Sequence, residues 1–163
     1  MKPALLVIDV QKAYFRPATQ NSLDGAIEYI NAAIDLFRKK GLPVISVQHM
    51  DREDGHVPGS EGFALPESLK INSDDLHIHK EYGNSFVKTP LADELRKLGA
   101  DTVILTGFCA EHCVLSTYRG AQDLDLTPIM LRNSLASPST KNIHFVESIS
   151  DVISYGALEK LLL

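Results

Sequence analysis

The chain has 163 residues, of which 44% are hydrophobic and 23% are charged, and its formal net charge is −5 at pH 7. This length supports one domain with a substantial core, so we expect a single domain over residues 1–163. An acidic chain without a basic run lacks the cationic surface typical of nucleic-acid binding, and no apolar run approaches the roughly 20 residues that cross a bilayer. We therefore expect neither nucleic acid nor a membrane as a partner.

The two cysteines predict free thiols in a reducing compartment. Residues 4–8 are too few for the apolar core of a signal peptide and run directly into Asp9. Without an export signal, Cys109 and Cys113 indicate a cytoplasmic protein. Their spacing is not that of a CxxC redox pair, and they have too few companions for a zinc site. We therefore expect no metal and no cofactor.

The first half of the chain predicts three strands and two helices. Residues 5–8 form a continuous apolar run, as expected for a strand that is buried on both faces. Residues 25–40 place apolar side chains on one helical face and end in a basic run before Gly41. Residues 42–48 and 75–80 predict two further strands, and alternation in the second of these separates Ile78 and Lys80 from His79. Residues 50–67 read as a long loop, and a helix over residues 91–98 ends at Gly99.

The second half of the chain continues the alternation of strands with helices. Strands are predicted over residues 102–106, 127–131 and 152–154, and helices over residues 111–123, 143–149 and 157–163. Residues 133–142 are polar and predict a loop. Strands that alternate with helices indicate a parallel sheet covered by helices on both faces. The sequence therefore predicts a doubly wound α/β fold with a six-stranded parallel sheet.

Three chemically capable residues are predicted at one edge of this sheet. Asp9 and Lys80 stand at the carboxyl ends of two strands, and Cys113 follows a third strand. In an open parallel sheet this edge is where ligands bind. The alternatives are that Asp9 caps a turn, that Lys80 is a solvated strand end or pairs with Asp9 only structurally, and that Cys113 is a small buried hydrophobe.

The chemistry of the three residues is complementary. A cysteine must lose its proton to attack a carbonyl, and Asp9 can accept that proton. Lys80 can stabilise the thiolate and keep Asp9 ionised. Cys113 is expected in the first turn of a helix that follows the Gly107 turn, where the helix dipole favours a thiolate and free N–H groups can hold an oxyanion.

The sequence resembles the isochorismatase-like superfamily of cysteine hydrolases, which includes the nicotinamidases. The matching pieces follow in the family's order and spacing across nearly the whole chain. They are LVIDVQ at residues 6–11, Lys80 with Ser85-Phe86 and Thr89-Pro90-Leu91, and the segment from Gly107 through Cys113-Val114 to Thr117.

This resemblance implies a six-stranded parallel sheet, an Asp9–Lys80–Cys113 triad and a small-molecule substrate. It also implies a cis peptide bond between Phe108 and Cys109, which turns the N–H of Cys109 toward the oxyanion site beside that of Cys113. Family members are commonly oligomeric, so a homo-oligomer is expected. Residues 49–56 lack the metal-binding pattern of nicotinamidases, which argues against a metal and against nicotinamide as the substrate.

Further side chains are candidates for the wall of a substrate pocket. Each of them has a second interpretation, since aromatic residues also fill cores and a histidine is more often structural or solvated. His112 adjoins Cys113, but neighbouring side chains on a helix diverge by about 100°. We therefore assign His112 to the rim of the pocket rather than to the base. The candidates are Phe15, His49, Phe86, Phe108 and His112.

The sequence thus predicts a cysteine hydrolase that cleaves an amide-type C–N bond in a small molecule through a thioester on Cys113. One alternative is hydrolysis of a vinyl ether, as in isochorismatase itself, which needs an acid at Asp9 rather than a thiolate. Another is a redox-responsive or ligand-binding domain that uses the thiols of Cys109 and Cys113.

Overall fold

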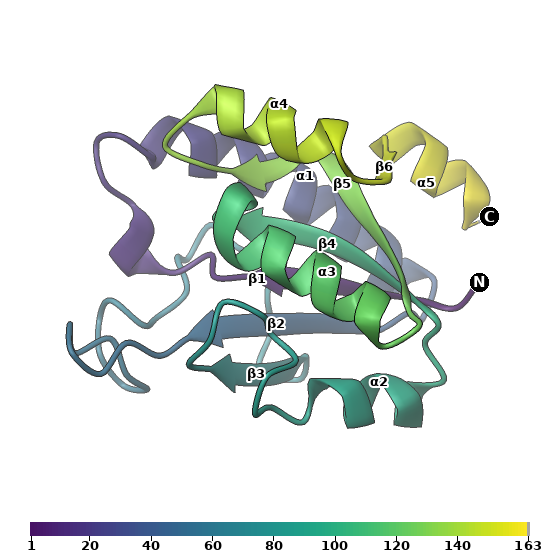
Figure 1. Ribbon diagram of the computed structural model, residues 1–163, viewed down its shortest axis with the longest axis horizontal. Coiled ribbons are helices and arrows are strands. Elements are labelled where there is room, and N and C mark those ends of the chain that lie inside the picture. The colour runs from purple at the N-terminus through teal and green to yellow at the C-terminus, as the bar shows by residue number, and fades with distance from the viewer. Residues whose placement is uncertain (163) are drawn as a thin grey trace.

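A computed structural model describes residues 1–162 of the protein. Six parallel strands form one sheet in the order β3-β2-β1-β4-β5-β6, with the carboxyl ends of the strands at one edge (Figure 1). This confirms the predicted doubly wound architecture. The strands are β1 (Pro3–Ile8), β2 (Val44–His49), β3 (Leu76–Lys80), β4 (Thr102–Phe108), β5 (Thr127–Ala136) and β6 (Val152–Ile153).

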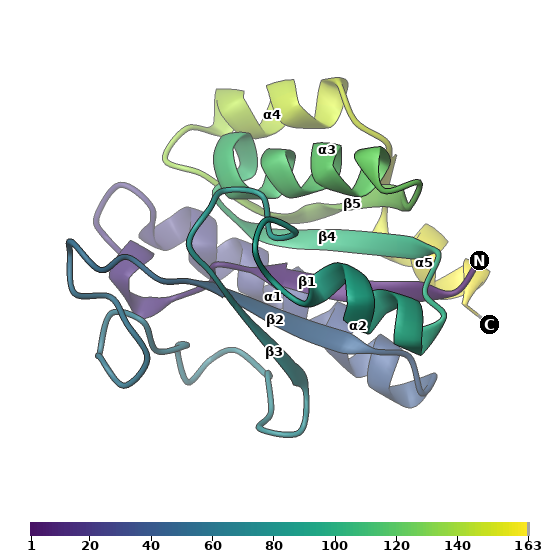
Figure 2. The same cartoon turned by 60° about the horizontal axis from the view of Figure 1, so that its bottom comes forward.

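Helices cover both faces of the sheet. In Figure 2, α2, α3 and α4 lie in front of the sheet, whereas α1 lies behind it. No helix among residues 1–162 is long and apolar enough to cross a membrane. The helices are α1 (Gln20–Lys39), α2 (Leu91–Leu98), α3 (Leu115–Asp123), α4 (Thr140–Ser148) and α5 (Tyr155–Leu161), with a 3₁₀ turn η1 (Lys12–Tyr14) and a π-helix η2 (Ala110–Val114).

Strand β1 lies near the middle of the sheet and separates two apolar cores. Its side chains alternate between them, so that Leu6 and Ile8 face α2, α3 and α4 while Leu5 and Val7 face α1. Every residue of β1 is buried, which explains its continuous apolar run. The alternation predicted for β3 is also confirmed, because Ile78 and Lys80 are buried while His79 is exposed.

Helix α1 and strand β5 extend furthest beyond their predicted bounds. Helix α1 begins at Gln20 rather than at residue 25, because Leu23 already faces the core. Strand β5 continues through the predicted loop at residues 133–142 as far as Ala136. Its second part pairs with the end of β4 after a register shift, with Gly107 opposite Leu135. Pairing with β4 therefore overrides the local polarity of this stretch.

Three helix predictions need smaller corrections. The predicted helix over residues 111–123 is divided into η2 and α3, and Cys113 lies in η2. Helix α4 begins at Thr140 instead of residue 143. The last helix begins at Tyr155 instead of residue 157, and Leu163, which the prediction included, lies outside the described residues.

Gly107 permits the close approach of β4 to β1. Its φ is +113°, and an added Cβ would lie 2.0 Å from the backbone oxygen of Ile8. That oxygen belongs to the central strand and cannot move aside cheaply. Ile8 directly precedes Asp9. The close contact between Gly107 and Ile8 therefore also fixes the position of Asp9 at the edge of the sheet.

Gly107→Ala is expected to destabilise the fold by about 3 kcal/mol or more, since it adds both a backbone clash and a strained φ. Gly25→Ala is the matched control, because Gly25 lies in α1 and its added Cβ meets nothing within 4 Å. The control should stabilise the protein by about 0.5–1 kcal/mol. Urea unfolding of both variants measures the difference, and a neutral Gly107→Ala would contradict the close packing.

Candidate active site

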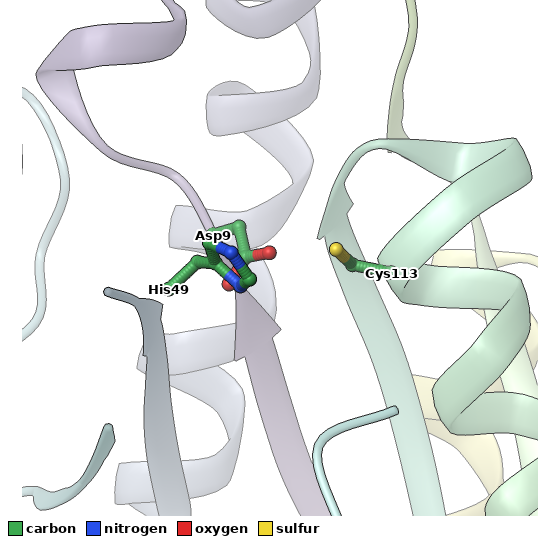
Figure 3. A group of neighbouring side chains, drawn as sticks. All are labelled: Asp9, His49 and Cys113. Carbon is green, nitrogen blue, oxygen red and sulfur yellow. The ribbon is translucent and has the colours of Figure 1, made fainter. Parts of the chain in front are cut away.

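The carboxyl ends of neighbouring strands bring four candidate side chains together. Asp9 directly follows β1, His49 and Lys80 end β2 and β3, and Cys113 lies in η2 beyond β4. Figure 3 shows Asp9 and His49 at the ends of their strands, with the sulfur of Cys113 directed toward them from the helical segment. The structure therefore places the three residues singled out at this edge, together with His49, in one cluster.

The Lys80 ammonium lies at the centre of this cluster. Nζ is 2.9 Å from Oδ2 of Asp9, 3.0 Å from Nδ1 of His49, 3.0 Å from the carbonyl oxygen of Tyr82 and 3.4 Å from Sγ of Cys113. The Lys80 side chain is 0% exposed and that of Asp9 is 2% exposed. Lys80 is thus not a solvated strand end, which was one of the alternatives from the sequence, because its charge is fully buried and paired.

An ammonium group has three protons, and here four acceptors surround it. The oxygen and nitrogen acceptors are the nearer ones, and the sulfur of Cys113 is the most distant. Lys80 therefore donates its three hydrogen bonds mainly to Asp9, His49 and the Tyr82 carbonyl. The thiol of Cys113 receives a weak contact rather than a full charge-assisted hydrogen bond.

Asp9 is prepared to take up a proton. Burial raises the pKa of Asp9 above its ordinary value, although the charge of Lys80 and the neighbouring Cys113 thiol oppose this. Its Oδ2 faces Lys80, whereas Oδ1 is buried and has no hydrogen-bond partner among residues 1–162. The backbone of Asp9 has a φ of +53°, which turns the chain out of β1 at this point.

The surroundings of Cys113 favour a protonated thiol at neutral pH. Burial and the Asp9 carboxylate raise the pKa of Cys113 to about 12, and Lys80 lowers it by less. This corrects the expectation that Lys80 and the helix terminus would favour a resting thiolate. The physical reason is that burial penalises the anion and that the Asp9 carboxylate, within 4.8 Å of the thiol, repels a negative charge there. The proton of Cys113 must therefore leave during a reaction.

His49 is a neutral member of the cluster. Burial and the charge of Lys80 lower its pKa, and we assign its proton to Nε2 because Nδ1 accepts from the ammonium. The side-chain amide of Gln11 bridges the backbone of His49, with bonds of 2.7 Å to its N–H and 2.9 Å to its carbonyl. Gln11 was not assigned a role from the sequence. Its position as a polar residue shortly after an apolar strand was nevertheless an indication that it lies at the edge of the sheet where the site forms.

The remaining predicted pocket residues are dispersed. Phe108 stacks on Tyr14, with ring centroids 5.0 Å apart, and burial together with the charge of Asp9 raises the pKa of Tyr14. Tyr14 therefore borders the cluster. Phe15 and Phe86 pack against the two cores on opposite faces of the sheet. His112 is exposed and lies with Cys109 and Glu111 rather than with the triad.

Cys109 is held apart from the triad. The peptide bond between Phe108 and Cys109 is cis, as the resemblance implies. Burial and the Glu111 carboxylate raise the pKa of the Cys109 thiol to about 12. Cys109 and Cys113 are both free thiols, and their side chains belong to two different groups of potential metal ligands. In the group that contains Asp9, His49 and Cys113, Lys80 already contacts every member.

Comparison with known proteins identifies the family. A family model described as the isochorismatase domain matches residues 3–149. The chain belongs to the isochorismatase family. A family relative from Bacillus subtilis, the uncharacterized isochorismatase family protein YrdC, is 32% identical over a 140-position alignment that covers 83% of this chain and 74% of the relative. The maleamate amidohydrolase of Pseudomonas putida is 25% identical over a 177-position alignment that covers 94% of this chain and 83% of that enzyme.

Solved structures of isochorismatase-like proteins have the same fold. The crystal structure of an isochorismatase-like hydrolase from Alkaliphilus metalliredigens matches all of both chains with a TM-score of 0.90 at 22% identity. The N-carbamoylsarcosine amidase from Thermoplasma acidophilum matches 94% of this chain and 95% of its own, with a TM-score of 0.81 at 26% identity. The family and the fold expected from the sequence are thus confirmed, and the chain is an isochorismatase-family hydrolase.

Removal of the buried cation is expected to be costly in this isochorismatase-family protein. Lys80→Met leaves the Asp9 carboxylate buried without a counter-ion, which should lower the free energy of unfolding by about 3–5 kcal/mol. Lys97→Met is the matched control, because Lys97 pairs with Glu94 at 2.7 Å but is 69% exposed. That control should leave the free energy of unfolding almost unchanged, because an exposed ion pair is screened by solvent. Equal losses in denaturant unfolding would contradict the central role of Lys80.

The raised pKa of Cys113 predicts a steep pH dependence of alkylation. Below about pH 11 the thiolate fraction should rise about tenfold per pH unit, and the rate of iodoacetamide labelling should follow it. Asp9→Asn removes the negative charge that raises this pKa, so labelling of Cys113 at pH 8 should accelerate, on the order of tenfold. Mass mapping separates Cys113 from Cys109, and slower labelling in Asp9→Asn would contradict the assignment.

Proposed function

We propose that the protein is a cysteine hydrolase that cleaves an amide-type C–N bond in a small molecule. One observation carries this proposal: Lys80 contacts Asp9 and Cys113 at once, while Oδ1 of Asp9 is buried and unpartnered. A nucleophile with its proton attached thus lies beside a base with a free oxygen and beside a fixed positive charge. A structural ion pair alone would not require the thiol.

The first half of the proposed reaction forms a thioester. Sγ of Cys113 attacks the carbonyl carbon of the substrate as its proton passes to Asp9. The carbonyl oxygen becomes an oxyanion, which the backbone N–H groups of Cys109 and Cys113 stabilise. When this intermediate collapses, the C–N bond breaks and the proton on Asp9 passes to the leaving nitrogen. The products of this half-reaction are a free amine or ammonia and an acyl group on Cys113.

The second half returns the enzyme to its starting state. Asp9, again a carboxylate, accepts a proton from a water molecule as that water attacks the thioester carbonyl. The C–S bond breaks, an acid is released, and Asp9 gives its proton back to Cys113. Lys80 remains charged throughout and keeps Asp9 positioned. His49 supports Lys80 by accepting one of its hydrogen bonds, so we assign it a positioning role.

Named relatives support C–N cleavage over other hydrolyses. The similar proteins include a maleamate amidohydrolase and an N-carbamoylsarcosine amidase, whose names specify an amide and a carbamoyl bond. Ureidoacrylate amidohydrolase from Methylobacterium radiotolerans is a further relative of this kind. We therefore place the substrate of this chain among small amides, carbamates and ureido compounds.

A substrate panel combined with two variants tests the proposal. The wild type should release ammonia or an amine from at least one amide, carbamate or ureido compound. Cys113→Ser should abolish this turnover. Asp9→Asn should lower it by about 10²–10⁴-fold, because no group then protonates the leaving nitrogen or activates water. Labelling of Cys113 should nevertheless continue in Asp9→Asn, so that thiol reactivity and turnover separate.

Two results would contradict the proposal. Turnover near the wild-type rate by folded Asp9→Asn, with circular dichroism as the check on folding, would reduce Asp9 to a turn residue. Hydrolysis of an isochorismate-type vinyl ether that persists in Cys113→Ser would instead support acid catalysis by Asp9. An acid catalyst must carry a proton, and burial raises the pKa of Asp9. The vinyl-ether assay therefore tests an alternative that the site can support chemically.

A further inference from the structure

A second group of metal-ligating side chains lies at the start of η2, outside the triad. The thiol of Cys109, the carboxylate of Glu111 and the imidazole of His112 place one ligand atom each within 4.8 Å of one another. Cys109 is buried, Glu111 is partly buried and His112 is exposed. The group therefore extends from the interior to the surface, where an ion can enter past His112.

The carboxylate of Glu111 has one fixed oxygen and one free oxygen. Oε1 accepts hydrogen bonds from Oγ of Ser137 at 2.9 Å and from Nδ2 of Asn142 at 2.8 Å. Oε2 is buried and has no hydrogen-bond partner among residues 1–162. Glu111 is thus held in one orientation, with one carboxylate oxygen lacking a hydrogen-bond partner, in the same group of side chains as the Cys109 thiol.

We propose that Cys109, Glu111 and His112 bind one Zn²⁺ ion, with water in the fourth position. Thiolate, imidazole and carboxylate are the ligand types that zinc takes in proteins, and the hydrogen bonds to Oε1 supply the outer contacts that orient a ligand. The metal replaces the proton of the Cys109 thiol, and that proton passes to the solvent. No electron is transferred in this step.

The present geometry needs only a small adjustment to bind the ion. Zinc lies about 2.0–2.3 Å from such ligands, which in a tetrahedron sets the ligand atoms about 3.5 Å apart. The exposed imidazole of His112 can rotate toward the other two ligands, since it is not packed in the core. Spacing along the sequence does not reveal the site, because it matches no familiar pattern of zinc ligands.

The proposed site is separate from the catalytic cluster but connected to it through η2. The carbonyl oxygen of Cys109 accepts bonds from the N–H groups of His112 at 3.0 Å and Val114 at 3.2 Å, on either side of Cys113. A metal that joins Cys109 to His112 would therefore brace the turn that carries Cys113. The ligand set of Asp9, His49 and Cys113 needs no such ion, because Lys80 already supplies its positive charge.

Cobalt provides a test that does not depend on catalysis. The reduced, metal-free full chain is titrated with Co²⁺, and zinc is then added in an equimolar amount. We expect a thiolate-to-cobalt charge-transfer band in the near ultraviolet and visible bands of a tetrahedral ion, both of which zinc abolishes. Cys109→Ser should lose the charge-transfer band, and His112→Gln should weaken binding by more than tenfold. Asn142→Ala should weaken it by about 10–100-fold through loss of an outer contact.

Two control variants locate the ion. Cys113→Ser should retain the cobalt spectrum, which separates this site from the catalytic cluster. His144→Gln should also retain it, because His144 is exposed on α4 and lies outside the ligand group. His112→Gln keeps the test valid if Cys109→Ser fails to fold, since His112 is a surface residue. Absence of a thiolate–cobalt band in the wild type, or its loss in Cys113→Ser with retention in Cys109→Ser, would overturn the proposal.

Discussion

The buried charge of Lys80 is the constraint on which the rest of the site depends. A lysine ammonium inside a protein is costly unless hydrogen bonds and an opposite charge surround it. Here its partners are Asp9, His49 and the carbonyl oxygen of Tyr82. Asp9 and His49 stand at the ends of β1 and β2, beside the β3 strand that Lys80 ends. The ammonium can thus be satisfied only when these parallel strands end together.

This arrangement also decides where the reactive proton lies. Burial raises the pKa values of both Asp9 and Cys113, so each group resists becoming an isolated anion. Lys80 supports one negative charge in the cluster, and its nearer contact is with Asp9. The positive charge of Lys80 therefore favours a carboxylate on Asp9 beside a protonated thiol on Cys113. A proton exchanged between these two neighbours leaves the total charge of the site unchanged, which suits repeated transfer in both halves of the proposed reaction.

The two cysteines show how environment assigns different roles to the same side chain. Burial and a neighbouring carboxylate raise both pKa values to about 12. Cys113, however, also contacts a cation and a base with a free oxygen, whereas Cys109 faces a carboxylate whose other partners are neutral. The first environment suits proton transfer and nucleophilic attack. The second suits capture of a positive ion, which is why we assign metal binding to Cys109.

The sequence by itself determined the order of the strands and helices, because continuous apolar runs and helical periodicity are local properties. It also placed Asp9, Lys80 and Cys113 at one edge, since parallel strands end on the same side. Only the tertiary structure decided that β5 extends to Ala136, because pairing with β4 outweighs local polarity there. It likewise decided that His49 contacts Lys80, that the thiol of Cys113 stays protonated and that Glu111 lies beside Cys109. These features depend on burial and on contacts between distant or rotated side chains, which no local pattern in the sequence specifies.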